Sequence, residues 1–532
     1  MRPDGKTESL RQSMAWLHTW SGLLLGWLLY AVFFTGTLSF FRDEINDWMR
    51  PELHRSVPSP DAWQRLFDGM ARIAPGASSW TLDLADSRHL AVWASWTRPG
   101  ASGGRKAVQQ ADLDAGSGEV LHPRATSGGD FFYNFHFRLY GIPRGLGRWI
   151  VGLATMVMLV ALVSGVITHK RIFVDFFTFR PRKGLRSWLD AHNALAVLAL
   201  PFHLVITFSG LLLLMSTLIP WGAQALFQGD SQRFRADLNR SNVTGLEIAA
   251  ARGDVALGQT AAYTPLGPLL AQANQAWTRG IGSIGLDQPG TADALIVLLE
   301  RAASRLTAPM TASRGLVFDA WTGQRVGQID VAPRAPAEVF YQFMQAVHLG
   351  RFADPALRWL LFLSGVLGTL MAGTGLVLFV IKRRPDRMKK GYTPGGHRLV
   401  EVLNVAAIAG ISVATAAYFW ANRVIPGDAP QRAEAEIAVF FSAWAFCLLH
   451  ATLRPHRRAW LEQLAFASAA ILLLPILNWA TGGTPLPQAI ARGQWSLAGF
   501  DLAVIVIGSI HSYAAWAVYR HHSEPRVARA QA

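Results

Sequence analysis

Eight long apolar runs constrain the fold of this chain more than any other feature. A helix needs about 20 apolar residues to cross a hydrocarbon layer about 30 Å thick, and each run approaches or exceeds that length. Only 16% of the 532 residues are charged, against about a quarter in soluble domains. The sequence therefore predicts a membrane all-α bundle of eight transmembrane helices, at residues 16–41, 149–168, 193–219, 358–381, 400–420, 437–453, 460–478 and 500–519.

Basic residues predict the orientation of these helices. The formal net charge is +15, and the lysines and arginines gather before the first run and after every second run. Connections rich in lysine and arginine stay in the cytoplasm, so both termini are expected there. This placement accounts for the positive charge, so the expected partner is the lipid bilayer and not nucleic acid. The basic stretches are residues 2–11, 170–186, 382–390, 454–458 and 520–529.

Two long segments, residues 42–148 and 220–357, are expected on the outer side of the membrane. Each contains a strand, a glycine-bearing turn and a second strand, in "DLDAGSGEVL" and in "GLVFDAWTGQRVGQIDV". Each then continues into an amphipathic stretch that carries a histidine, "FFYNFHFRLYG" in one and "VFYQFMQAVHLG" in the other. The two segments are therefore predicted to be small α+β domains of the same kind.

The similarity extends into the membrane and defines an internal repeat. His18 aligns with His192, and the ungapped alignment continues to Gly36 and Gly210. The chain is therefore expected to form a pseudo-two-fold bundle with an appended membrane domain. The predicted units are repeat 1 at residues 1–171, repeat 2 at 186–384, and a C-terminal four-helix membrane domain at 398–532.

Histidines inside or beside apolar runs are the candidate site residues. An ionisable side chain in a membrane helix is expensive and by default suggests a function. His192 and His203 are 11 residues apart, which in one straight α-helix puts both on the same side, about 16 Å apart along the axis. Neutral imidazole is a common axial ligand of haem iron. The candidate haem-iron ligands are His18, His136, His169, His192, His203 and His348.

The spacing leaves the pairing of these histidines open. A cytoplasmic-side haem would use His192 with His18 or His169, and an outer-side haem would use a pair among His203, His136 and His348. Zinc transport competes with haem binding, but no Asp or Glu accompanies these histidines inside the runs. A structural role, with the imidazoles bonded to neighbouring helices, is the other alternative.

Arginines at the outer ends of the second and fourth runs run against the positive-inside bias. They include Arg148 and Arg358, and they stand at helix N-termini, where a cation is unfavourable. An anionic group should compensate them, and haem propionates or an acidic substrate would fit a guanidinium fork.

The single cysteine, Cys447, excludes an internal disulfide, an iron–sulfur cluster and covalent c-type haem attachment. The chain also lacks a Walker A sequence and a G-x-G-x-x-G between a strand and a helix. Electrons entering from inside would therefore come from a membrane quinol or from another membrane or cytoplasmic donor.

Several motifs in order resemble the PepSY-associated transmembrane-helix proteins, which include iron-regulated inner-membrane proteins of the PiuB type and ferric-siderophore reductases. The similar segments are "LHTWSGLLLGW", "FHFRLYGIPRGLGRWIVGL", "SGVITHKRIFVDFFTFRP", "SWLDAHNALAVLALPFHLVITFSGLLLLM" and "HLGRFADPALRWLLFLSG". The resemblance covers about residues 10–390 and implies that the two outer segments are PepSY-like periplasmic domains. It also implies a multi-pass protein of the bacterial inner membrane.

The resemblance implies a haem-dependent oxidoreductase. The expected activity is that of a ferric-siderophore reductase with haem b, two per chain, passing electrons across the membrane to release iron in the periplasm. One alternative is a permease or accessory subunit for the iron chelate without redox activity. Another is a PepSY-based regulator of a periplasmic protease.

Overall fold

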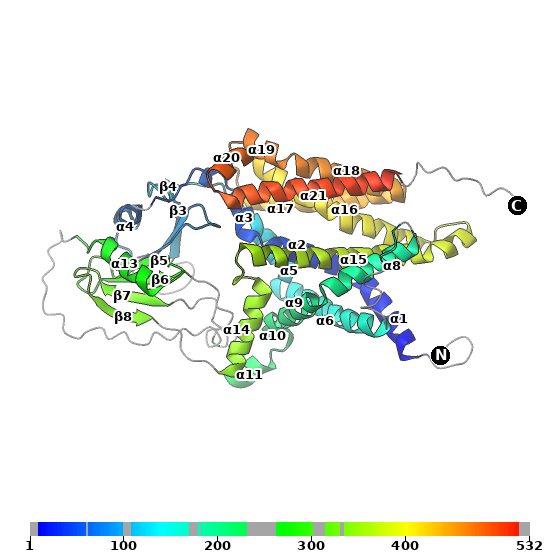
Figure 1. The fold of residues 1–532 in the computed structure, drawn as a ribbon, viewed down its shortest axis with the longest axis horizontal. Coiled ribbons are helices and arrows are strands. Elements are labelled where there is room, and N and C mark those ends of the chain that lie inside the picture. Colours follow the sequence, from blue (N-terminus) through cyan, green and yellow to red (C-terminus); the bar gives the residue numbers. More distant parts are fainter. Residues whose placement is uncertain are drawn as a thin grey trace.

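The computed structural model describes residues 9–59, 62–98, 108–169, 179–181, 183–230, 233, 262–301, 314–329 and 335–520. A bundle of long helices carries a β-sheet at one end, and the start of α1 (Leu10–Leu24) and the end of α21 (Trp495–Arg520) lie at the opposite end (Figure 1). We call these ends the sheet side and the termini side. The basic residues predicted to set the orientation at 2–8, 170–178, 182 and 521–529 lie outside the described ranges.

Six helices of the described chain are each long and apolar enough to cross a membrane. They are α6 (Arg144–Thr168), α15 (Pro355–Lys390), α16 (Gly395–Val424), α17 (Arg432–Leu453), the pair α18 and α19 (His456–Leu472 and Leu474–Ala480), and α21 (Trp495–Arg520). Two further pairs pass the same test only when taken together. They are α1 with α2 (Leu10–Leu24, Gly26–Ser39) and α8 with α9 (Leu185–Leu198, Leu200–Leu213). The structure thus gives six spans, or eight if each bent pair is one.

Both bent pairs break where the backbone cannot continue a regular helix. The axes change direction by 65° between α1 and α2 and by 64° between α8 and α9. The second break is followed by Pro201 in the first turn of α9, where the missing N–H and the ring disfavour an uninterrupted helix. His192 and His203 therefore lie on opposite sides of a bend that Pro201 signals in the sequence, and the straight-helix geometry of their 11-residue step does not apply.

The two outer segments form one continuous sheet rather than two separate ones. Its eight strands are all antiparallel, in the order β4-β3-β2-β1-β5-β6-β7-β8. The first segment gives β1 to β4 and the second β5 to β8, and β1 pairs with β5 at the centre, with Thr81 opposite Gly285. The strands are β1 (Ser79–Asp83), β2 (Val92–Thr97), β3 (Val108–Leu113), β4 (Val120–Leu121), β5 (Ile281–Asp287), β6 (Leu295–Glu300), β7 (Gly315–Asp319) and β8 (Arg325–Ile329).

Each half of the sheet begins with a helix, α4 (Ala62–Ile73) or α13 (Leu266–Ala276), so the two halves repeat one order of elements. Both helices pack on the sheet and share its buried core with Leu82 and Ile284 of the central strands. The predicted turns also match. Asp114 accepts from the backbone N–H groups of Gly116 and Ser117, and Asp319 accepts from those of Trp321 and Thr322.

Short helices connect the sheet to the bundle. Two of them, α5 and α14, carry His136 and His348 in their last turns. The set comprises α3 (Arg42–Trp48), the 3₁₀ turn η1 (Pro51–Leu53), α5 (Gly128–Arg138), α10 (Met215–Leu218), α11 (Trp221–Phe227), α14 (Pro336–Leu349) and α20 (Leu486–Ala491).

The C-terminal helices are integrated into the molecule rather than appended to it. The most apolar stretch of α16 is 83% buried, the highest share among the six spanning helices of the described chain. Asn404 of α16 accepts a hydrogen bond from Trp27 of α2 and donates one to the Leu376 carbonyl of α15. On the sheet side, Trp48 of α3 donates to Asp501 of α21. One hydrophobic core runs through both parts.

Candidate functional site

Four of the six predicted histidines meet in two pairs. The ring centres of His18 and His192 are 6.3 Å apart, and those of His136 and His348 are 6.1 Å apart. Each pair joins equivalent positions of the two repeats. His18 contacts Ala161 in the last third of α6, and His192 contacts Met371 at the middle of α15. His136 and His348 come from helices that enter the bundle from the sheet.

Each of these imidazoles is oriented by a hydrogen bond from Nδ1. The Nδ1–H groups donate to the Ala161 carbonyl from His18 (2.8 Å), the Met371 carbonyl from His192 (3.0 Å) and the Val32 carbonyl from His136 (2.7 Å). A carbonyl only accepts, so Nδ1 carries the proton and Nε2 is the basic nitrogen.

His348 reaches the same state through a serine. The Ser209 hydroxyl donates to the Val205 carbonyl at 2.6 Å and therefore accepts from the His348 Nδ1–H at 3.0 Å. The His348 ring also hydrogen-bonds the carbonyl of Ile206. All four paired imidazoles thus carry a proton on Nδ1 and have Nε2 available as the ligand atom.

A glycine stands one turn after each of these carbonyls and forms the surface on which the ring packs. A Cβ atom would lie 2.5 Å from the His136 ring if built on Gly36, 3.0 Å from His348 on Gly210, 3.1 Å from His18 on Gly165 and 3.3 Å from His192 on Gly375. In a helix the carbonyl of residue i points along the axis toward residue i+4. A glycine there lets an imidazole from another helix reach that carbonyl.

The spacing of both pairs matches two imidazoles on opposite faces of one metal ion. An imidazole nitrogen binds a metal at about 2 Å and lies about 1 Å from its ring centre, so two such rings have centres about 6 Å apart. The observed 6.3 and 6.1 Å agree with this value. The donor set of each pair, two imidazoles at this spacing, fits a haem iron, so His18 with His192 and His136 with His348 would each hold one such group.

His203 and His169 do not join a pair. His203 is fully buried against Phe33, with ring centres 5.9 Å apart. Its ring interacts with the Ser364 backbone but makes no hydrogen bond of standard geometry among the described residues. It packs at Gly368 of α15, two turns from Gly375, where His192 packs. His169 caps the end of α6. The structure therefore selects His18 as the neighbour of His192 and places His136 beside His348.

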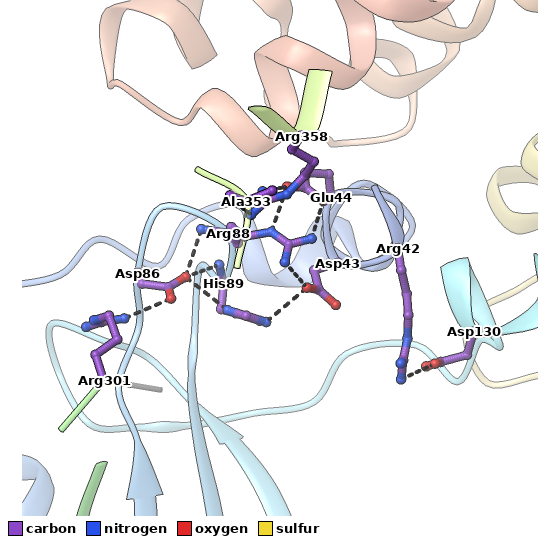
Figure 2. A network of polar contacts seen from close by, with 10 residues as sticks. All are labelled: Arg42, Asp43, Glu44, Asp86, Arg88, His89, Asp130, Arg301, Ala353 and Arg358. Carbon is purple, nitrogen blue, oxygen red and sulfur yellow. Dashed lines mark hydrogen bonds and ion pairs between the residues drawn. The ribbon is translucent and has the colours of Figure 1, made fainter. Parts of the chain in front are cut away.

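An ionic network joins the sheet to the bundle on the sheet side (Figure 2). Arg358, at the start of α15, donates to Glu44 at 3.2 Å and to the Ala353 carbonyl at 2.9 Å. Arg88 donates to both Glu44 oxygens at 2.9 and 3.0 Å and pairs with Asp43 at 2.8 Å. Glu44 is thus an anionic partner of Arg358, and a role for Arg358 toward a bound group stays a prediction.

Arg148, the repeat equivalent of Arg358, lies over the ring of Phe137, 5.4 Å from its centre. That Arg148 binds an anionic group, such as a haem propionate or an acidic substrate, stays a prediction. The two arginines occupy the first turns of α6 and α15. The two arginines therefore hold equivalent positions in the repeat but have different neighbours, Phe137 for Arg148 and Glu44 for Arg358.

His89 extends the ionic network to solvent. It is half exposed and lies 2.9 Å from Asp86 and 3.7 Å from Asp43. Burial lowers the pKa of His89, but the hydrogen bond that its ring N–H donates to Asp86 and the charges of Asp43 and Asp86 outweigh this, so the pKa is raised. The same contact with His89, together with Arg301, holds the pKa of Asp86 below its usual value.

Sequence reasoning missed the groups that orient the histidines. The signal was present, because Gly165 and Gly375 occupy equivalent positions of the repeat, as do Gly36 and Gly210. Among the described residues, no group of three or more His, Cys, Asp or Glu side chains is placed to hold a metal ion. The candidate ligands of the described chain therefore come in twos.

Comparison with known proteins agrees with the architecture. The family model described as the PepSY-associated TM region matches residues 15–382, which include both histidine pairs and both halves of the sheet. No curated protein matches the chain. The match covers most of the sequence, and the chain therefore belongs to the PepSY-associated transmembrane family.

Proposed function

We propose that this protein is a di-haem b electron carrier of the bacterial inner membrane that reduces ferric siderophore in the periplasm. The proposal rests on two histidine pairs at different depths of the bundle. The ring centres are 6.3 Å apart in the pair His18–His192 and 6.1 Å apart in the pair His136–His348. The family match supports a membrane protein of the PepSY-associated family. In this proposal the sheet side faces the periplasm and both termini face the cytoplasm.

The chain's own residues would hold the haem groups by four Nε2 atoms. His18 and His192 would hold one haem, and His136 and His348 the other. Haem iron with two imidazole ligands supplies reversible one-electron transfer. The Nδ1–H bonds to Ala161, Met371 and Val32 keep the proton on Nδ1, fix the orientation of each ring and raise the basicity of Nε2.

The substrate would be a ferric chelate on the sheet side. One electron converts the bound Fe(III) to Fe(II), and a hard oxygen-donor chelate holds the softer, less charged ion more weakly. His136 and His348 end the two helices that descend from the sheet. These two histidines therefore stand nearest in sequence to the segments that would meet the chelate.

The test is the absorbance of protein purified from haem-replete cells. We expect a dithionite-reducible b-type spectrum and about two haems per chain by pyridine haemochrome. His192→Ala and His348→Ala should each remove one haem and leave the other. His122→Ala, at an exposed position on the sheet side, is the matched control and should keep both.

A colourless wild-type protein would refute this function and favour a permease, an accessory subunit or a PepSY-based regulator. Loss of both haems in His203→Ala, with His348→Ala unchanged, would refute the pairing. Reduction of a ferric hydroxamate chelate by the prereduced protein, followed as Fe(II) with a ferrous indicator, tests the last step.

A further inference from the structure

A long apolar crevice lies between the repeat bundle and the C-terminal helices. Its volume is about 440 Å³, within the range of about 300–1,000 Å³ typical of ligand sites. Helix α16 forms one wall, α2 and α15 a second, and α18, α19 and α21 a third. Lining residues on α21 run from Trp495 to His511, about 24 Å along the helix axis.

The crevice has apolar walls and two polar ends. Phe34, Phe362 and Phe500 are among its walls, and it reaches the molecular surface at Trp359 and Trp495, which are 38% and 61% exposed. At its inner end, His511 Nε2 accepts from the Ser412 hydroxyl at 3.0 Å. At the sheet side, Ser87 and the Glu44 carboxylate line the crevice together with Arg88 and Arg358.

One acceptor position of Glu44 remains available to a ligand. A carboxylate offers about four lone-pair positions. Three are taken among the described residues, two by Arg88 and one by Arg358. A hydroxyl group of a ligand in the crevice can therefore donate to Glu44 without breaking the ionic network.

We propose that this crevice binds a lipid-soluble quinol, with its ring at Glu44 and Ser87 and its apolar tail along α21 toward His511. The proposal rests on the proposed function, for which it names the electron donor. A neutral ring with exchangeable hydroxyls matches a site whose two guanidinium groups are already neutralised by Glu44 and Asp43. A phospholipid phosphate would need a cationic partner, but Arg88 and Arg358 are already paired with Glu44 and Asp43.

The redox balance follows from the residues at the ring end. Oxidation of one quinol to the quinone releases two electrons and two protons, and two ferric ions on the sheet side each take one electron. Glu44 accepts the hydrogen bond of a quinol hydroxyl at the ring. Arg88 bridges Glu44 to Asp43 and holds the carboxylate in place, but its guanidinium stays protonated and relays no proton. The two protons therefore pass to water where the crevice reaches the molecular surface at Trp359 and Trp495.

The test blocks the crevice without disturbing the fold. Gly499 lines the crevice, and a Cβ built on it meets nothing within 4 Å. In Gly499→Phe the new side chain therefore has room at its Cβ and extends into the crevice, where it occupies the volume of the ligand. Gly22→Phe is the matched control, because Gly22 also has open space at its Cβ but does not line the crevice. The probe is radiolabelled decylubiquinone, titrated against each protein in detergent.

We expect wild type and Gly22→Phe to bind about one probe per chain, and Gly499→Phe to bind at least about tenfold more weakly. No saturable binding by wild type, or equal binding by all three proteins, would overturn the proposal. The binding assay needs no haem, so it is separable from the proposed function. A red protein that does not bind the probe overturns only the quinol site, and a colourless protein that binds it overturns only the haem proposal.

Discussion

A helix carbonyl and the glycine one turn later orient each paired imidazole. At Gly36 a Cβ would lie 2.5 Å from both Nδ1 and Cε1 of His136, closer than real Cβ contacts allow. Gly36→Ala should therefore push the ring from the Val32 carbonyl and reduce the haem content by about half. Pyridine haemochrome measures this loss. Gly22→Ala, where the added Cβ meets nothing, is the control, and full haem content in Gly36→Ala would contradict the orienting role.

A second residue-scale prediction concerns acid stability. His54 is buried, accepts from the Thr484 backbone N–H and donates to the Asp47 carbonyl. Burial, helped by the charge of Arg423, lowers the pKa of His54 to about 3. Between about pH 6.5 and pH 3 the unfolded chain binds a proton at this residue and the folded chain does not. Acidification through this window therefore disfavours folding by up to about 1.4 kcal/mol per pH unit.

The measurement is the difference in melting temperature between wild type and His54→Gln in detergent at pH 7 and at pH 5. Glutamine keeps a donor and an acceptor but does not titrate. The wild type should lose more stability than the variant on acidification. Parallel curves for the two proteins would contradict the assignment to His54.

The candidate ligands were largely predictable from single residues, whereas their pairing was not. An imidazole in an apolar run is expensive, and this flagged His18, His192 and His203 alike. The distinction between them depends on which helix lies opposite, and that is a property of packing. His203 faces Phe33, and nothing in its own flanking sequence separates it from His192.

At the scale of elements, the turns and strands were predictable and the seam between the two sheet halves was not. The alternation and turn residues around Asp114 and Asp319 are local signals. The pairing of β1 with β5 joins segments some 200 positions apart, and no local pattern encodes it. The bend at Pro201 was signalled by the proline, but its 64° angle is set by tertiary packing.

The pairing of β1 with β5 is expected to hold the two halves of the sheet together. Thr81 lies in β1, which pairs with β2 on one side and β5 on the other. Thr81→Pro removes a ladder hydrogen bond from a central strand and should cost about 3 kcal/mol or more. We expect limited proteolysis to cleave both halves of the sheet faster than in wild type. Thr81→Val keeps a β-branched side chain and is the control, and resistance of Thr81→Pro would refute a structural role for the seam.

At the scale of the whole molecule, the C-terminal helices are bound to repeat 1 by buried polar groups. Arg432 and Glu436 form a fully buried ion pair. Arg432 donates to the Ala125 carbonyl at 2.9 Å, and Thr126 donates to Glu436 at 2.6 Å. The short connections of the C-terminal runs suggested an independent domain, because hydropathy reports membrane insertion and not which helices pack together.

This interface predicts that the chain can be divided after Gly391, in an exposed turn between α15 and α16. Tagged residues 1–391, co-expressed with residues 392–532, should capture the second fragment in detergent, because both fragments insert as helices and then share one core. Glu436→Ala in the second fragment leaves the Arg432 charge buried without its partner. Because Arg432 lies in the same fragment, the change acts on the association by removing the acceptor of the Thr126 hydroxyl across the interface, and it should weaken the association by about 1.5–3 kcal/mol, as for a hydrogen bond to a charged group.

The matched control for the divided chain is Glu434→Ala, two positions away in the first turn of α17, outside the buried pair. Equal recovery of the fragments with Glu434→Ala and with Glu436→Ala would show that apolar packing alone holds the two parts together. Recovery with Glu434→Ala only would show that the contact of buried Glu436 with Thr126 selects the partner. The second outcome is expected, because a membrane gives apolar helix faces little preference for one another over lipid, so polar contacts at the sheet side must supply the specificity.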